Sequence, residues 1–310
     1  MLMKLLYALF ITGVGFQLGT LNYRFDTAAH NLQPRIADGE NAQIEEMPYV
    51  VKLISSTGIC SGAIISESWI LTAAHCISPI GTDVKIFAGS DKKYDNLTQK
   101  RYALSIHKHD YYEKGKISQY DLALIEVYKY IKVTPFKLNE RIGIVKLSDD
   151  MWPQGDTKYN RSCLAAGWGV PEVGQKLVAQ LQKLRVTASH GDRGCKCWPS
   201  FQNKRLICLH EKSGSGICLG DSGSALVCDD KAVGIAHIVY LVDSCDPLAF
   251  KKIEFKCTTT AGVYTYICPH LNWIRRYVPS VPMTPASCRG SKYSHKELIS
   301  FVLLKVLLLI

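Results

Sequence analysis

The sequence contains no run of five or more basic residues, although its formal net charge is +10. Its adjacent lysines, Lys92-Lys93 and Lys251-Lys252, are ordinary solvated pairs. Proteins that bind nucleic acids need a clustered basic surface to contact the phosphate backbone. The charge pattern therefore argues against a nucleic-acid partner.

Long hydrophobic runs are also absent. The apolar segment 5–16 is shorter than the ~20 residues of a membrane-spanning helix. It follows Lys4 and contains Gly13-Val14-Gly15, which is typical of a secretory signal with small residues near its cleavage site. We expect the signal to occupy residues 1–19.

A second apolar segment, 298–310, ends the chain and is interrupted by Ser300 and Lys305. It follows a polar stretch in which Gly290-Ser291 could serve as an anchor attachment site. Two interpretations stay open for residues 279–310, a removable anchor signal and a loosely ordered appendage.

Linkers, repeats and low-complexity tracts are absent between these ends. Short apolar runs separated by turn residues indicate an all-β sandwich or barrel. One helix is predicted near residue 270, with Leu271, Ile274 and Val278 on one face and Pro279 ending it. The apolar runs are Tyr49–Ile54, Ala63–Ile65, Trp69–Ala73, Val84–Phe87, Leu122–Val127, Leu164–Trp168, Ala225–Cys228, Ala232–Val239 and Gly262–Ile267.

Cysteine, by contrast, is abundant. Twelve cysteines, an even number, indicate an oxidising compartment and a disulfide framework. The triplets beginning at Asn96 and Asn160 are glycosylation acceptors and agree with a secreted surface. Cys195-Lys-Cys197 lacks a second ligand pair, so we expect no metal, and nothing in the sequence points to a cofactor.

Ser222 stands in the segment Cys218-Leu-Gly-Asp-Ser-Gly-Ser-Ala-Leu226. Gly220 and Gly223 allow the backbone to turn sharply and bring N–H groups close to whatever Ser222 contacts. An exposed hydroxyl on a rigid support beside backbone donors is the arrangement of an activated nucleophile. A simple Gly-Ser turn is the alternative.

Two other residues supply what a serine nucleophile requires. His75 ends one apolar strand, and Asp121 opens another. A serine hydroxyl needs a base to remove its proton, and histidine can accept a proton near neutral pH. A carboxylate then fixes the imidazole tautomer and stabilises the imidazolium. The sequence thus predicts a site with one candidate for each role.

The blocks Ala73-Ala-His75-Cys76, Asp121-Leu-Ala-Leu and Gly220-Asp-Ser222-Gly resemble the signature segments of the chymotrypsin-like (trypsin-fold) serine peptidases, in that family's order. The resemblance covers about residues 36–278. It implies two six-stranded antiparallel β-barrels with a C-terminal α-helix. By this resemblance His75 is the general base and acid, Asp121 orients it and Ser222 is the nucleophile. The N–H groups of Gly220 and Ser222 would form the oxyanion hole.

The segment 33–41 resembles the family's activation site, with cleavage between Arg35 and Ile36. The new ammonium group of Ile36 would pair with Asp221, since a buried carboxylate without a partner is costly. The resemblance therefore implies a zymogen with a propeptide at 20–35, a peptidase domain at 36–278 and a C-terminal extension at 279–310.

The resemblance also implies a set of disulfides. Cys268 and Cys288 remain outside that set, with one cysteine of each ambiguous pair, and these four could form two extra bridges. The implied pairs are Cys60–Cys76, Cys163–Cys228, Cys208 with Cys195 or Cys197, and Cys218 with Cys245 or Cys257.

The predicted substrate pocket departs from the family. Gly216 occupies the pocket floor, where a trypsin-like enzyme has an aspartate, so cleavage after Lys or Arg is not expected. Val239 replaces a glycine and narrows the mouth, while Ile217 reduces polarity and Gly262 leaves some depth. These residues predict a preference for aliphatic side chains, with acceptance of Leu or Phe as the alternative.

His237 and Ile238 belong to the strand that binds the substrate backbone in this family. His237 replaces a serine there. It keeps the backbone carbonyl but brings a titratable ring close to Asp121, where it could weaken the hold of Asp121 on His75.

We therefore predict a secreted serine endopeptidase acting through an acyl-enzyme. The expected partners are protein or peptide substrates, an activating trypsin-like peptidase and protein inhibitors, with a membrane only if the C-terminal segment is an anchor signal. The alternatives are a catalytically silent homologue acting as a binding protein, which His237 favours, and a peptidase tethered to the outer cell surface.

Overall fold

The computed structural model describes residues 39–288 except 57, 78–82, 93–94, 130–131, 151, 153–159, 170–179, 191–204, 211–215, 219 and 242–259. The proposed signal, the cleavage site at Arg35–Ile36 and the hydrophobic end of the chain lie outside the described residues. So do Cys195, Cys197, Cys245 and Cys257.

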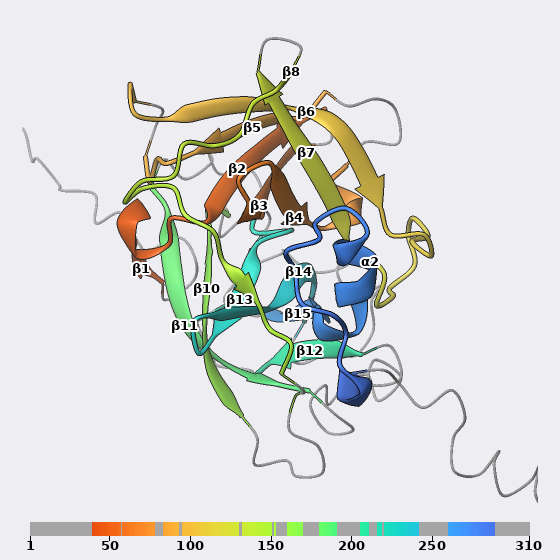
Figure 1. The fold of residues 1–310 in the computed structure, drawn as a ribbon. Helices are drawn as coiled ribbons and strands as arrows, with labels where there is room; N and C mark the ends of the chain where they lie inside the picture. Colours follow the sequence, from red (N-terminus) through yellow and green to blue (C-terminus); the bar gives the residue numbers. More distant parts are fainter. Residues whose placement is uncertain are drawn as a thin grey trace, which may run out of the picture. The chain divides into compact units, whose positions relative to one another are not determined.

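The first barrel is a closed antiparallel sheet (Figure 1). Its hydrogen-bonded order is β4-β3-β2-β5-β6-β7, and pairing of β4 with β7 closes it. Residues alternate between core and surface along β2, where Val51 and Leu53 are buried and Lys52 lies between them. The strands are β2 (Val50–Ser55), β3 (Gly58–Ser66), β4 (Trp69–Thr72), β5 (Lys85–Ala88), β6 (Gln99–Lys108) and β7 (Ala123–Lys129), with β8 (Lys132–Val133) added beside β7.

The second barrel is built in the same way, in the order β11-β10-β13-β14-β15-β12, and closes through β11 and β12. Two six-stranded antiparallel barrels confirm the predicted fold class. The strands are β10 (Arg161–Gly167), β11 (Gln182–Ser189), β12 (Leu206–Leu209), β13 (Ala225–Cys228), β14 (Lys231–Leu241) and β15 (Thr260–Tyr266), with β1 (Glu40–Asn41) beside β11 and β9 (Lys146–Leu147) beside β14.

A short helix follows the second barrel. After the 3-10 turn η5 (Cys268–His270), helix α2 runs over Leu271–Arg275. Leu271, Ile274 and Val278 are buried as predicted, and Trp273 is buried with them. No helix among the described residues is long and apolar enough to cross a membrane.

The chain after the helix continues into the same hydrophobic core. Val281 and Cys288 are both 5% exposed and belong to that core, and a disulfide joins Cys288 to Cys268. Cys288 lies in the last described turn, η6 (Ala286–Cys288). Within the first ten residues of the predicted extension, Val281, Thr284 and Cys288 are therefore buried.

Two of the pairs that the resemblance implied, Cys60–Cys76 and Cys163–Cys228, are present. Cys208 and Cys218 are also disulfide-bonded, and the partners expected for them lie outside the described residues.

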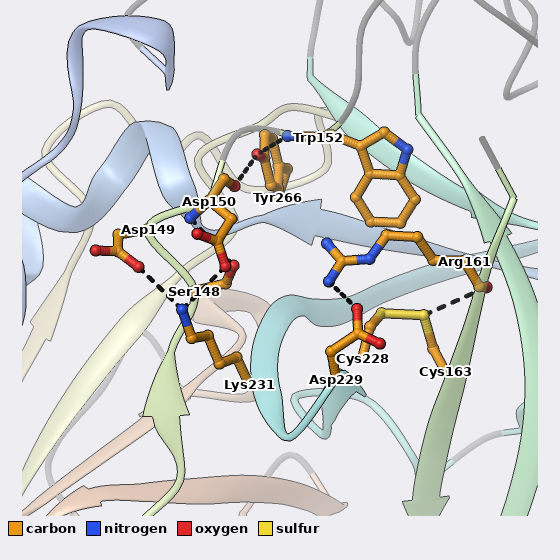
Figure 2. Close-up of polar contacts among 10 residues, drawn as sticks. All are labelled: Ser148, Asp149, Asp150, Trp152, Arg161, Cys163, Cys228, Asp229, Lys231 and Tyr266. Carbon is orange, nitrogen blue, oxygen red and sulfur yellow. Dashed lines mark hydrogen bonds and ion pairs between the residues drawn. A yellow bond between two sulfur atoms is a disulfide. The ribbon is translucent and has the colours of Figure 1, made fainter.

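The segment that connects the barrels is tied to the second one (Figure 2). Lys231 of β14 forms ion pairs with Asp150 (2.9 Å) and Asp149 (3.3 Å). The Tyr266 hydroxyl donates to the Asp150 carbonyl (3.0 Å) and accepts from the Trp152 N–H (2.8 Å). The connection thus forms part of the second barrel's surface.

The same view shows the Cys163–Cys228 disulfide between β10 and β13. Next to it, Arg161 pairs with Asp229 at 2.5 Å, and its guanidinium lies 5.1 Å from the centre of the Trp152 ring. These contacts lie beside the turn between β13 and β14, which follows the strand that leads away from Ser222.

Candidate active site

His75 and Asp121 are brought together by strand pairing in the first barrel. In the pairing of β4 with β7, Thr72 lies opposite Ala123. The chain leaves β4 into the 3-10 turn η2 (Ala74–Cys76), which carries His75, and Asp121 stands just before β7. The Cys60–Cys76 disulfide anchors this turn to β3.

Asp121 is fully buried and binds His75 at two points. Its Oδ1 accepts the backbone N–H of His75 (2.8 Å), and its Oδ2 accepts the ring Nδ1–H (2.6 Å). Burial opposes ionisation of this carboxyl, but hydrogen bonds from His237 and His75 outweigh burial and hold the pKa of Asp121 below its usual range. The ring of His75 is thereby held in one orientation.

The loop carrying Ser222 is bound directly to the first barrel. The Ser222 carbonyl accepts the N–H of Ser61 (2.8 Å), and the Ser61 hydroxyl donates to the Gly220 carbonyl (3.1 Å). Thr72 then donates its hydroxyl to the Ser61 carbonyl (2.8 Å). Residues of β3 and β4 therefore position the loop next to the turn that carries His75.

Gly223 makes this close approach possible. Its φ is +82°, and a Cβ at this position would lie 2.2 Å from Thr72 Oγ1 and 2.4 Å from the Ser61 carbonyl oxygen. Only glycine satisfies both the backbone conformation and the contact.

Backbone N–H groups around Ser222 fall into two sets. Those of Asp221, Gly223 and Ser224 donate to the carbonyls of Cys218, Ala236 and Asp221, at 2.9 to 3.1 Å. Those of Gly220 and Ser222 have no acceptor among the described residues. These two are the groups that the sequence assigned to an oxyanion hole.

Asp221 is fully buried and is bound by backbone donors. Its Oδ1 accepts the N–H of Gly169 and its Oδ2 that of Cys218, both at 2.8 Å. Burial raises the pKa of Asp221 to about 6, against the effect of these two hydrogen bonds. No cationic group among the described residues pairs with it, and Ile36, its expected partner, is outside them.

A cavity of about 460 Å³ unites the candidate residues. His75, Asp121, Ser222 and His237 all line it, and no hydrogen bond joins Ser222 to His75. One wall of the cavity was not predicted from the sequence. It is formed by four residues between β6 and β7, namely Tyr112, Gly115, Lys116 and Ile117. No motif in that segment marks these residues as part of a site.

The apolar end of the cavity is formed by the residues predicted for the substrate pocket. Ile217, Ile238 and Val239 line it, whereas Gly216 and Gly262 are buried and are not among the lining residues. The side chain of Ile217 lies against Gly262. A Cβ added to Gly262 would lie 2.7 Å from both Cγ1 and Cδ1 of Ile217. Val239 lies directly opposite Gly262 in the pairing of β14 with β15.

His237 reaches the carboxylate from the second barrel. Its Nδ1 donates to Asp121 Oδ2, the same oxygen that His75 contacts. The two imidazole rings are 6.2 Å apart, centre to centre. The structure therefore places the ring where the sequence predicted it.

Among the described residues, two groups of side chains are close enough by distance to share a metal ion. In the first, Cys60 and Cys76 are joined as a disulfide and are not available as thiolates. In the second, both ring nitrogens that face Asp121 already donate hydrogen bonds to it, which makes His75, Asp121 and His237 a hydrogen-bonded network.

Both predicted glycosylation acceptors are exposed. Asn96 lies in a turn next to Asp95 and Thr98, whose side chains are hydrogen-bonded to each other (2.9 Å). Asn160 Oδ1 accepts from the Ser189 hydroxyl (3.0 Å).

Comparison with known proteins gives a consistent result. The sequence matches the family model described as Trypsin over residues 36–274. It is 29% identical to trypsin V-B of Rattus norvegicus over 79% of this chain and 89% of that protein. It is 25% identical to kallikrein-1E2 of Equus caballus over 80% of this chain and 91% of that one. The solved structure of neuropsin, a serine protease expressed in the limbic system of mouse brain, matches with a TM-score of 0.63 and 21% identity, over 78% of this chain and 99% of that one.

Proposed function

Because the chain belongs to the trypsin family and is a serine-type endopeptidase, we propose that Ser222, His75 and Asp121 form its catalytic triad. The observation that carries this proposal is the 2.6 Å hydrogen bond from His75 to buried Asp121, in the cavity that Ser222 lines.

In this mechanism His75 takes the proton of Ser222 as the hydroxyl attacks the peptide carbonyl. With the Nδ1 proton held by Asp121, the free electron pair of the ring is on Nε2. The N–H groups of Gly220 and Ser222, which have no acceptor in the described part of the chain, then bind the developing oxyanion. One such donor typically contributes about 3 kcal/mol. His75 returns the proton to the leaving amine, and water hydrolyses the acyl-enzyme.

Activation follows from the environment of Asp221. We propose that cleavage between Arg35 and Ile36 creates an ammonium group that pairs with this carboxylate. Its complete burial supports the proposal, since a buried charge without a counter-ion destabilises the fold. The pair would lower the pKa of Asp221 from about 6 and fix the neighbouring N–H groups of the oxyanion hole.

The apolar end of the cavity supports a preference for small or medium aliphatic residues before the scissile bond. Ile217, which lies against Gly262, and Val239 line the cavity with branched side chains that leave less room for a long one. Gly216 offers no carboxylate to pair with Lys or Arg. Self-activation at Arg35 is therefore not expected, and a separate trypsin-like peptidase would be required.

Secretion is proposed from the N-terminal apolar segment and from the disulfides, which persist in oxidising compartments. The anchor interpretation of the C-terminal segment remains a second proposal for where the enzyme acts. Release from membranes by a phospholipase that cleaves lipid anchors tests it.

The triad is tested by labelling with a fluorophosphonate probe, which reacts only with an assembled serine site. Protein cut at Arg35–Ile36 should be labelled, whereas Ser222→Ala and the uncut chain should not. Folded, correctly cut protein that refuses the probe would instead support a silent homologue acting as a binding protein. The contact of His237 with Asp121 favours that second function.

A further inference from the structure

The side chain of His237 has no role in the mechanism above, yet it contacts the centre of the site. Strand β14 shifts register against β15 between Ala236 and Ile238, so His237 stands at a bulge. Bulges re-aim side chains out of the regular pattern of a sheet. Here the ring of His237 reaches Asp121, on the first barrel.

Asp121 Oδ2 therefore serves two imidazole rings. It accepts Nδ1–H of His75 at 2.6 Å and Nδ1–H of His237. Asp121 has no exposed surface, so water does not contribute to binding its charge. In such an environment the hydrogen-bond donors of the protein determine how strongly the carboxylate attracts a further positive charge.

The buried face of His237 determines which of its nitrogens carries the proton. His237 is 6% exposed, and its Nε2 has no hydrogen-bond partner among the described residues. A proton on Nε2 would be a buried donor without an acceptor, which is costly. The geometry thus places the proton on Nδ1, facing Asp121.

We propose that His237 is a positioning residue that shares Asp121 with His75 and so weakens the stabilisation of protonated His75. The inference rests on the proposed triad. Its consequence is that His75 stays unprotonated, and the enzyme active, at a more acidic pH than if Asp121 served one histidine.

Other ionisable groups near the network come from several elements. Tyr112 is neutral, since burial and then Asp121 raise its pKa to about 12. Lys108 of β6 donates to the Ile77 carbonyl (3.0 Å), and Lys116 forms an exposed pair with Glu113. Asp221, on the Ser222 loop, has a pKa raised by burial to about 6 in the uncut chain. A comparison of variants at position 237 keeps all of these groups constant.

The test uses two substitutions of nearly equal shape, His237→Asn and His237→Leu. Asparagine can place an N–H where Nδ1 lies, and leucine cannot. The full chain cut at Arg35–Ile36 is assayed from pH 5 to 9, measuring both kcat/KM and the rate of fluorophosphonate labelling. On the acid side of the pH profile, the fall in kcat/KM and in labelling rate (the acid limb) should move to higher pH by about 0.5 to 1 unit in the leucine variant. In the asparagine variant the acid limb should stay where it is in the wild type.

A leucine variant whose acid limb stays in place, or an asparagine variant that shifts equally, would overturn the proposal. If the leucine variant does not fold, the wild-type protein still decides. In its proton NMR spectrum, both Nδ1 protons should resonate far downfield, and a spectrum with only one such signal would contradict a shared carboxylate. If the wild-type enzyme is not labelled at any pH, the triad is contradicted as well. If it is labelled but the acid limb does not move in the leucine variant, only the role of His237 is contradicted.

Discussion

The two barrels contribute unequally to the site. The first holds the residues proposed to move the proton, His75 and Asp121, joined by hydrogen bonds of 2.6 and 2.8 Å. The second holds the proposed nucleophile and the apolar end of the cavity. Departures from the family's pattern are concentrated in the second barrel, at Gly216, His237 and Val239. We propose from this comparison that the chemistry is retained while the specificity and the pH range are altered.

The largest effect is expected from breaking the contact between the barrels at Gly223. In Gly223→Ala the new Cβ would collide with Thr72 and the Ser61 carbonyl, and the Ser222 loop would have to move away. A displacement of about 1 Å can cost a hundredfold in rate, so kcat/KM should fall at least that much. Gly58→Ala is the matched control, because Gly58 also has a positive φ (+127°) but no atom within 4 Å of its Cβ position. Equal effects of the two substitutions would show that the contact is unimportant.

Stability of the second barrel should depend on the chain after helix α2. The Cys268–Cys288 disulfide spans a separation of 20 residues. Replacing both cysteines by serine should lower the free energy of unfolding by about 3 kcal/mol, through loss of a constraint on the unfolded chain. Urea denaturation of the double variant and the wild type measures it. An unchanged midpoint would mean that the disulfide adds nothing to the stability of the barrel.

A smaller, pH-dependent effect is expected where α2 packs on the first barrel. His270 Nδ1 lies 3.1 Å from Nε2 of His109. Burial lowers the pKa of His109 to about 4 and that of His270 to about 3, from 6.5. Both rings stay neutral in the folded protein while the unfolded chain binds protons, so their contribution is present above pH 6.5 and is lost as the pH falls toward 4.

The melting temperature, measured between pH 7.5 and 4.5, should fall less steeply in His270→Phe than in the wild type. The phenylalanine keeps the aromatic packing against His109 and removes one buried site of protonation. Parallel curves for the two proteins would argue that this histidine pair does not govern acid stability.

The smallest effect is expected at the surface of the second barrel. Asp229 pairs with Arg161, but its side chain is 79% exposed. Exposed pairs contribute little, so Asp229→Asn should change the free energy of unfolding by less than about 0.5 kcal/mol. Asparagine also tolerates the positive φ of 50° at this position. A loss above about 1 kcal/mol would show that the pair fixes the turn after β13.

The apolar runs of the sequence predicted nine of the twelve barrel strands in their observed places, but β6, β11 and β12 escaped detection. β6 and β11 carry charged residues at exposed positions, such as Lys100 in β6 and Arg185 in β11, so neither forms a continuous apolar run. β12 is apolar but only 4 residues long. The strands with which they pair in the closed barrels specify their extended structure instead. A strand such as β6, with one face exposed to solvent, gives only a weak signal in the sequence, because packing against its neighbours decides its structure.

For the site, short motifs marked His75, Asp121 and Ser222 because each role requires a particular residue type in a particular local setting. The pairing of Cys268 with Cys288 could not be deduced, since connectivity does not follow from cysteine spacing. The contact of His109 with His270 was equally inaccessible. It joins residues 161 positions apart, and neither belongs to a motif.

One measurement tests most directly whether the chemistry is retained while the specificity has changed. It is a cleavage profile of the protein cut at Arg35–Ile36 on a peptide library, with Ser222→Ala as control. We predict cleavage after Ala, Val or Leu that disappears in the variant. Cleavage mainly after Arg or Lys would contradict the assignment of Ile217 and Val239 as pocket walls, and cleavage that persists in Ser222→Ala would contradict the triad itself.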